Sequence, residues 1–287
     1  GFVRLSNLII LLFCKISLLT LALQISLNLN FNRFRKIIFY LFLSISFLSL
    51  VNYFNDAQFV KRSLLTLIFL NILIHVLKNS YGYSFLYFLL GSFSVLSMLW
   101  FLDIGAYINF IIFLLLALFL IRSEYKIFLS IISGVIFGWI IFYFHFSAEE
   151  IESFLFNTAS IYSTIDQIHG LIYPTPFFSA DSRATKTLIF FVIGGIFCIK
   201  LCLNKKNNFN NTNKIFFFLL FILSLVSFKT GLSRSDSAHI KTSIGPLMII
   251  LFTYAIYLLV VFFDKKLKNK IHDKYKNVSI ILISFLV

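Results

Sequence analysis

The sequence contains little charge. Only 13% of its 287 residues are charged, whereas soluble domains carry roughly 25%. Hydrophobic residues make up 60% of the chain, and phenylalanine alone contributes 39 residues. The interior of a soluble fold cannot hold that many apolar side chains, so most of them must face lipid. The composition therefore predicts an integral membrane protein.

Cysteine and proline are also scarce. The three cysteines, Cys14, Cys198 and Cys202, stand in apolar runs without enough neighbouring ligand residues for a metal site, which indicates packing residues. The three prolines, at positions 174, 176 and 246, fall at or near expected helix ends. No small-residue cleavage pattern of a signal peptide follows the first apolar run. With no initial Met and an apolar last run, the chain is expected to be a fragment cut at both ends.

Apolar runs of about 20 residues are long enough to cross a bilayer. Such runs predict an all-α, polytopic membrane protein with nine or ten transmembrane helices in a single domain, residues 1–287. The helices are expected near 8–29, 37–53, 64–77, 84–100, 105–121, 127–146, 187–203, 215–229 and 244–263, with a tenth beginning near 277.

The charges separate by side of the membrane. The connections 30–36, 78–83, 122–126, 204–214 and 264–276, with Lys200, carry sixteen basic and three acidic residues, a net charge of 16 − 3 = +13. The opposite connections carry eight of each sign, a net charge of zero. Basic loops stay in the cytoplasm, so the first set is predicted to be cytoplasmic. The excess of positive charge is thus an orientation signal, and nucleic acid is not expected as a partner.

One long connection, residues 147–186, lies on the opposite, non-cytoplasmic side. It begins with Ser147 and, three residues later, Glu150, the spacing of a helix capping box. Apolar and polar residues then alternate with a helical period, which predicts an amphipathic helix on the membrane surface followed by a loop.

The stretch 231–242, GLSRSDSAHIKT, gathers polar residues between two apolar runs. Arg234 and Lys241 offer phosphate-binding cations, while Asp236 and His239 can move or orient a proton. An alternative reading is a solvated turn whose cations meet lipid headgroups.

Two further stretches fall on the same side. Arg183 and Lys186 stand three residues apart at the start of a helix, where both can reach a phosphate or simply face the headgroups. Asp103 stands in a very short turn between two spans, as a base, a cation ligand or the cap of the next helix. His75, alone in a span, is interpreted as a packing or interhelical hydrogen-bonding residue.

Three short motifs together resemble a known family. They are WFLDIGAYIN at 100–109, GLIYPTPFFSADSRATKT at 170–187 and GLSRSDSAHI at 231–240. Their order is similar to that of bacterial multi-spanning glycosyltransferases of the GT-C type, which use polyprenyl-phosphate-linked sugars. The family's usual acidic residue in the first external loop has Asp56 as its only counterpart in the first complete external loop here.

The resemblance implies a cavity at the outer interface of a bacterial cytoplasmic (inner) membrane. Asp103 or Asp236, with His239, would serve catalysis, and Arg183, Lys186, Arg234 and Lys241 would bind phosphate. The partners would be a lipid-linked sugar donor, a glycan or lipid acceptor and membrane lipids. No cofactor is firmly implied, and a divalent cation stays open. The competing hypotheses are a polymerase or ligase of lipid-linked oligosaccharides, and a transporter or flippase of an anionic or lipid-linked substrate.

Overall fold

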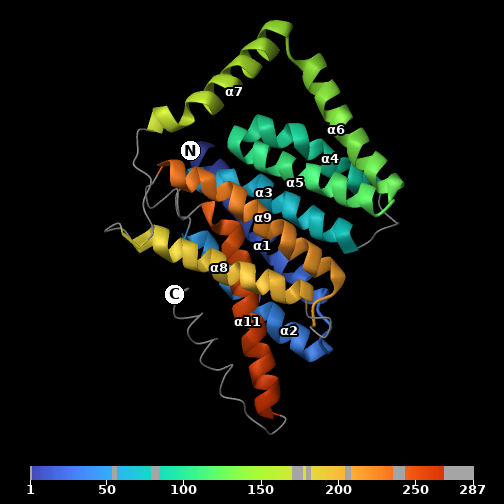
Figure 1. Cartoon of the computed structure of the whole chain (residues 1–287), viewed down its shortest axis with the longest axis vertical. Coiled ribbons are helices and arrows are strands. Elements are labelled where there is room, and N and C mark those ends of the chain that lie inside the picture. The colour runs from blue at the N-terminus through green and yellow to red at the C-terminus, as the bar shows by residue number, and fades with distance from the viewer. Residues whose placement is uncertain are drawn as a thin grey trace.

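The computed structural model describes residues 2–53, 57–78, 84–169, 177–178, 182–203, 208–234 and 243–267. These residues form almost nothing but helices (Figure 1). In chain order they are α1 (Phe2–Leu27), α2 (Arg33–Tyr53), α3 (Ala57–Lys78), α4 (Ser84–Trp100), α5 (Leu102–Ile121), α6 (Tyr125–His145), α7 (Ala148–His169), α8 (Ser182–Leu203), α9 (Asn211–Arg234) and α11 (Gly245–Leu267). The predicted all-α class is confirmed.

Six of the described helices are long and apolar enough to cross a membrane, which makes this a multi-pass membrane protein. They are α5 and α6, together with the segments Leu5–Leu27, Thr185–Leu203, Asn211–Lys229 and Gly245–Phe263 of α1, α8, α9 and α11. The expected count of nine or ten is not confirmed. The runs predicted at 37–53, 64–77 and 84–100 do form helices, but α2 begins with three basic residues, α3 is basic near both ends, and α4 has only 17 residues. The tenth run, near 277, lies outside the described residues.

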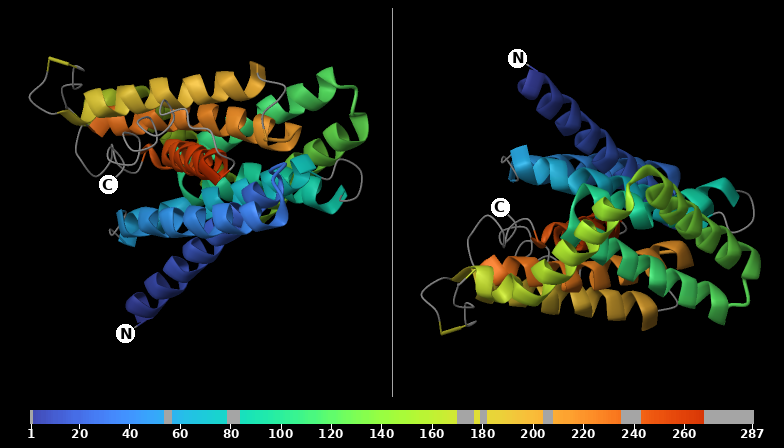
Figure 2. Two further views of the ribbon diagram at one scale, coloured as in Figure 1. Left: turned by 90° about the horizontal axis from the view of Figure 1, so that it is seen from below. Right: turned by 90° about the horizontal axis from the view of Figure 1, so that it is seen from above.

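Helix α11 occupies the middle of the bundle, between the pair α8 and α9 on one side and α1 and α2 on the other (Figure 2). Aromatic rings fill the contacts around it. Tyr254 stacks on Phe197 of α8 with ring centroids 4.4 Å apart. One turn further along α11, Tyr257 contacts Phe209, at 4.8 Å, and Phe31, at 5.9 Å. Part of the large phenylalanine content therefore packs helix against helix, because aromatic pairs bury much apolar area in defined geometries.

Helices α4 and α6 approach each other through glycine. A Cβ on Gly91 would collide with the carbonyl oxygen of Ile131, and a Cβ on Gly134 would collide with that of Phe88. The Ser92 hydroxyl also donates to the Gly134 carbonyl at 3.3 Å. Small residues let helix backbones pack closely in membranes, where lipid provides no hydrophobic driving force between helices. The α4–α6 contact therefore depends on these two glycines.

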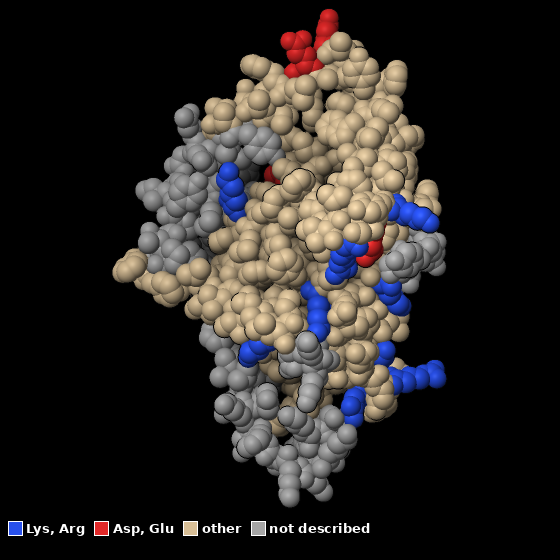
Figure 3. Space-filling model, turned by 45° about the vertical axis from the view of Figure 1, so that its right-hand side comes forward, with Lys and Arg blue, Asp and Glu red and all other residues tan. Residues whose placement is uncertain are grey.

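The predicted same-side connections 30–36 and 204–214 lie together with the end of α3 at one end of the bundle, here called the basic end. Leu29 and Phe209 form an isolated antiparallel bridge, and the Asn30 N–H donates to the Asn208 carbonyl at 2.7 Å. The Thr212 hydroxyl, at the start of α9, donates to the Leu77 carbonyl, at the end of α3, over 3.4 Å. Figure 3 shows basic side chains concentrated on the part of the surface turned forward from the right of Figure 1. The charge pattern thus identified segments that meet in space.

The helix predicted after Ser147 forms as α7, and its position on the membrane surface stays a prediction. It meets α6 at a corner that stands away from the other helices (Figure 1). The backbone N–H of Ser147 donates to Glu150 Oε2 at 2.8 Å, and the Glu150 N–H returns to the Ser147 hydroxyl at 3.3 Å. These two bonds form the predicted capping box. A ring contact of 5.4 Å between Phe142 and Phe154 holds α7 against α6.

Acidification is expected to fray the first turn of α7. Hydrogen bonds from the backbone N–H and the hydroxyl of Ser147 hold the pKa of Glu150 below its ordinary 4.5. A lowered pKa contributes stability that is complete above the ordinary value and is lost as the pH falls through the lowered one. Hydrogen exchange at the N–H groups of Ser147, which donates to the Glu150 carboxylate, and of Ile151, which donates to the Ser147 carbonyl, should therefore be faster, relative to intrinsic rates, at about pH 3 than at about pH 6. The Glu150→Ala variant should exchange fast at both pH values, and equal protection of the unchanged chain at both would contradict the cap.

Candidate functional site

A salt bridge joins α3 to α5 near the beginning of each helix. Nη2 of Arg62 donates to Asp103 Oδ1 at 3.0 Å and to Oδ2 at 2.8 Å. The guanidinium carbon also lies 4.9 Å from the ring centroid of Phe101. The side chains of Arg62 and Asp103 are 26% and 22% exposed, so the pair is mostly shielded yet reachable. Charge attraction and the cation–π contact together fix the position of the carboxylate.

The hydrogen bonds of the pair leave capacity for a ligand. Oδ1 of Asp103 accepts from Arg62 and from the backbone N–H of Ile104, at 2.9 Å. Among the described residues, Oδ2 accepts from Arg62 alone, and a carboxylate oxygen has two lone pairs. Nε of Arg62 is buried and has no hydrogen-bond partner in the same part of the chain. The site can therefore accept one more donor at Oδ2, such as a hydroxyl group.

A polar network behind the salt bridge ties α5 to α4 and α6. The Ser94 hydroxyl donates to Asn109 Oδ1 at 2.6 Å, and Asn109 Nδ2 donates to the carbonyls of Ser94 and Gly105 at 2.9 and 2.8 Å. The indole N–H of Trp139 donates to the Ser94 hydroxyl at 3.1 Å. Gly105 packs directly on Met98, because a Cβ there would lie 2.6 Å from the Met98 backbone. Satisfied polar networks specify one packing arrangement, so this one holds the start of α5 in place.

The salt bridge lies at the end of the bundle opposite to the basic end. Along α3, Arg62 precedes Lys78 by sixteen residues, which is about 24 Å of helix. Along α5, Asp103 and the cap residue Arg122 are separated by about 28 Å. We call this end the Asp103 end.

Three of the other predicted residues belong to helices that reach the Asp103 end. Helix α9 begins at the basic end, so its last residue, Arg234, lies at the Asp103 end. Helix α8 packs antiparallel to α9, with the rings of Phe191 and Phe228 at 5.1 Å, and Arg183 precedes that contact in the first turn of α8. Lys186 follows in α8 with an exposed side chain. The side chains of Arg183 and Arg234 are not among those described, and Asp56, Asp236, His239 and Lys241 lie outside the described residues.

The sequence interpretation missed Arg62 and the hydrogen-bonding role of Asn109. In the sequence, Arg62 precedes the helix expected near 64–77 and so falls in a connection on the non-cytoplasmic side, whereas α3 begins at Ala57 and includes it. The available signal was topological, because Arg62 and Asp103 had both been assigned to the same side of the membrane. Asp103 does not act as the N-cap either. Phe101 holds that position, and Asp103 belongs to the first turn of α5.

No group of three or more His, Cys, Asp or Glu side chains gathers as a metal site within the described ranges. Within these ranges, the charged partner of Asp103 is the guanidinium of Arg62. The sequence matches no protein-family model, and it shows no significant similarity to a curated protein or to a solved structure.

Proposed function

We propose that this protein is a membrane-embedded glycosyltransferase. It moves a sugar from a polyprenyl-phosphate donor to a glycan or lipid acceptor on the non-cytoplasmic face of a bacterial inner membrane. The observation that supports this function best is the mostly shielded Asp103 carboxylate, held by Arg62 at the end of the bundle opposite to the basic connections.

Asp103 acts as the general base in this proposal. Its Oδ2 accepts the proton of the acceptor hydroxyl, and the acceptor oxygen attacks the first carbon of the sugar. The bond between that carbon and the phosphate oxygen breaks, and its electron pair leaves with the polyprenyl phosphate. The proton on Asp103 then passes to the leaving phosphate or to solvent. Asp236 and His239 are the second candidates for proton transfer.

Cations stabilise the phosphate as it leaves. Arg183 and Arg234 belong to helix ends at the same end of the bundle as Asp103. Arg234, Arg183 and Lys186, with Lys241, are proposed to bind the phosphate of the donor. Fixed cations placed beside a developing negative charge stabilise it more strongly than water does. A divalent cation remains compatible with this chemistry and is not required by it.

The test is sugar transfer by the purified protein in proteoliposomes. The donor is a short-chain polyprenyl phosphate carrying a radiolabelled hexose, and the acceptors are a panel of lipid-linked oligosaccharides and glycans. The proposal expects label in the acceptor and free polyprenyl phosphate as coproduct. Joining of whole oligosaccharides instead of single sugars would favour the ligase or polymerase. Movement of the donor across the bilayer without transfer would favour the transporter, and either result would overturn the proposal.

Labelling of single cysteines tests the orientation. In a Cys202→Ser background, a Ser123→Cys variant at the basic end is expected to react only when a membrane-impermeant maleimide reaches the cytoplasmic side, because basic loops stay there. An Ala148→Cys variant at the start of α7 should react from the opposite side. The two positions serve as each other's control, since both are exposed. Reaction of both from one side would contradict this orientation.

A further inference from the structure

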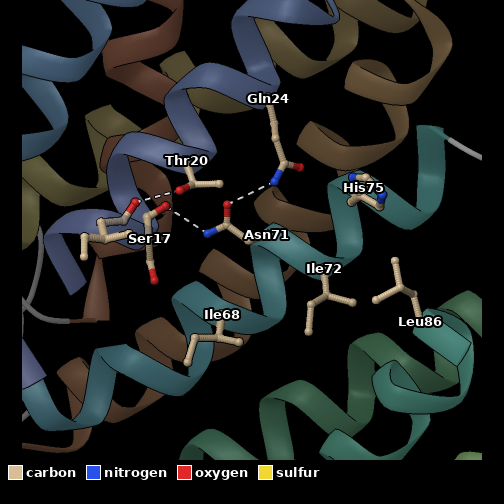
Figure 4. A pocket seen from close by; sticks show the side chains of 9 residues that line it. Ser17, Thr20, Gln24, Ile68, Asn71, Ile72, His75 and Leu86 are labelled. Carbon is tan, nitrogen blue, oxygen red and sulfur yellow. Dashed lines mark hydrogen bonds between the residues drawn. The ribbon is translucent and has the colours of Figure 1, made fainter. Parts of the chain in front are cut away.

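A pocket lined by both polar and apolar side chains opens between α1, α3 and α4. Its volume is about 280 Å³. It is lined by Ile16, Ser17, Thr20, Gln24, Ile68, Asn71, Ile72, His75 and Leu86 (Figure 4). The α1 residues among them fall inside the membrane-length segment Leu5–Leu27. Ile16 is itself 49% exposed, so the pocket lies on a surface of α1 that faces lipid.

One hydrogen-bond acceptor in the pocket is unused. Gln24 Nε2 donates to Asn71 Oδ1 at 3.3 Å, and Asn71 Nδ2 donates to the carbonyls of Ser17 and Leu67, each at 2.9 Å. These bonds hold the two amides in place (Figure 4). Oε1 of Gln24 is buried and has no hydrogen-bond partner among the described residues. Buried polar atoms in native proteins are almost always hydrogen-bonded, so an unused acceptor at membrane depth indicates a missing donor.

The lining restricts what that donor can be. None of the nine lining residues is Lys, Arg, Asp or Glu, and His75 is the one titratable side chain among them, so the pocket offers no permanent charge to a phosphate or an ammonium group. The apolar wall of Ile68, Ile72 and Leu86 suits a hydrocarbon chain. We propose that this pocket binds a lipid alcohol, an uncharged lipid whose hydroxyl donates to Gln24 Oε1 while its chain lies along that wall. The proposal is independent of the transferase activity and concerns a different part of the bundle from Asp103.

The probe is a diacylglycerol with a photoactivatable diazirine near its free hydroxyl, presented to the full chain in nanodiscs. Irradiation followed by peptide mapping should place the label within residues 16–24 and 68–75. Unlabelled diacylglycerol should compete, whereas its acetyl ester, which lacks the donor hydroxyl, and phosphatidic acid, which is charged, should compete about tenfold less well.

Two variants test the pocket in different ways. Gln24→Met removes the acceptor at nearly constant volume and should lower labelling between about threefold and tenfold. Ile72→Trp fills the apolar wall and should abolish labelling without touching the amides. Ser130→Ala is the control and should label normally. It removes a hydroxyl on α6 that donates within its own helix, to the carbonyl of Lys126. Size-exclusion elution and helical circular dichroism show which variants are folded.

Several results would overturn the proposal. Equal competition by the alcohol and its acetyl ester would show that no hydroxyl is recognised, and unchanged labelling of a folded Gln24→Met or Ile72→Trp variant would place the lipid elsewhere. Absence of label in the two peptides would mean that water, not lipid, satisfies Gln24.

Discussion

Replacing Gly134 with alanine is expected to destabilise the folded protein by about 2–3 kcal/mol, the usual cost of overpacking a tight contact. The new Cβ would collide with the Phe88 carbonyl oxygen of α4, and a backbone atom cannot move aside as a side-chain end can. The helices must then separate, which also weakens the hydrogen bond from Ser92 to the Gly134 carbonyl. The loss outweighs the gain of about 1 kcal/mol in helix propensity that alanine brings over glycine.

Gly138→Ala provides the matched control, one turn along the same helix. A Cβ there would lie 3.4 Å from a side-chain carbon of Val95, which is an ordinary contact, so this variant should be as stable as the unchanged chain or slightly more stable. Unfolding in mixed micelles with increasing SDS measures the difference. Fluorescence of Trp139, on α6, reports the separation of the helices. Equal unfolding midpoints for the two alanine variants would show that α4 and α6 do not pack through Gly134.

The Asp103→Asn variant is expected to transfer sugar about 10³-fold more slowly than the unchanged protein, within the range found for general bases. Asparagine can still accept hydrogen bonds from Arg62 and Ile104 through its one oxygen, but it cannot take a proton from the acceptor hydroxyl. The turnover rate with a saturating polyprenyl-phosphate donor is the measurement. Stability should change little, because partly exposed ion pairs contribute only about 1 kcal/mol or less.

Arg62→Met separates catalysis from packing in the same experiment. This variant removes the α3–α5 salt bridge while leaving the carboxylate, so it tests what the salt bridge alone contributes to sugar transfer. We expect it to retain more transfer than Asp103→Asn, since the base is still present though less well held. Full transfer by Asp103→Asn would exclude Asp103 as the base and leave Asp236 as the candidate.

The helices were the predictable part of this fold. Long apolar runs admit only helices in lipid, because every backbone polar group must be satisfied within the segment. The capping spacing of Ser147 and Glu150 was likewise sufficient to place the start of α7, since the cap uses neighbouring residues only. The number of spans is confirmed only for six of the described helices, and the predicted nine or ten stays a prediction. The basic residues near the ends of α2 and α3 and the short length of α4 are unfavourable for a membrane span. A prediction from apolar content alone does not take them into account.

The site was predicted only in part. Asp103 stood out because a lone acid in a short turn is conspicuous, and topology assigned it to the correct end relative to the basic connections. The cation that pairs with Asp103 could not be identified from the sequence. Arg62 lies 41 residues away, and which of several cations on that side meets Asp103 depends on how α3 and α5 pack. The unused acceptor on Gln24 could not be predicted from the sequence either, because it depends on how two helices are positioned and not on a local sequence pattern.

The hydrogen bond between Asn213 and Ile25 has a consequence for biosynthesis. The Asn213 amide on α9, whose side chain is fully buried, donates at 3.2 Å to a carbonyl of α1 that is 188 residues earlier in the chain. At ordinary rates of synthesis, α1 is in the membrane for about 10–40 s before that partner exists. The first helix must therefore persist in lipid, or beside the insertion machinery, without its final neighbour. Its high hydropathy of 2.4 allows this, because a segment so apolar is stable in the bilayer alone.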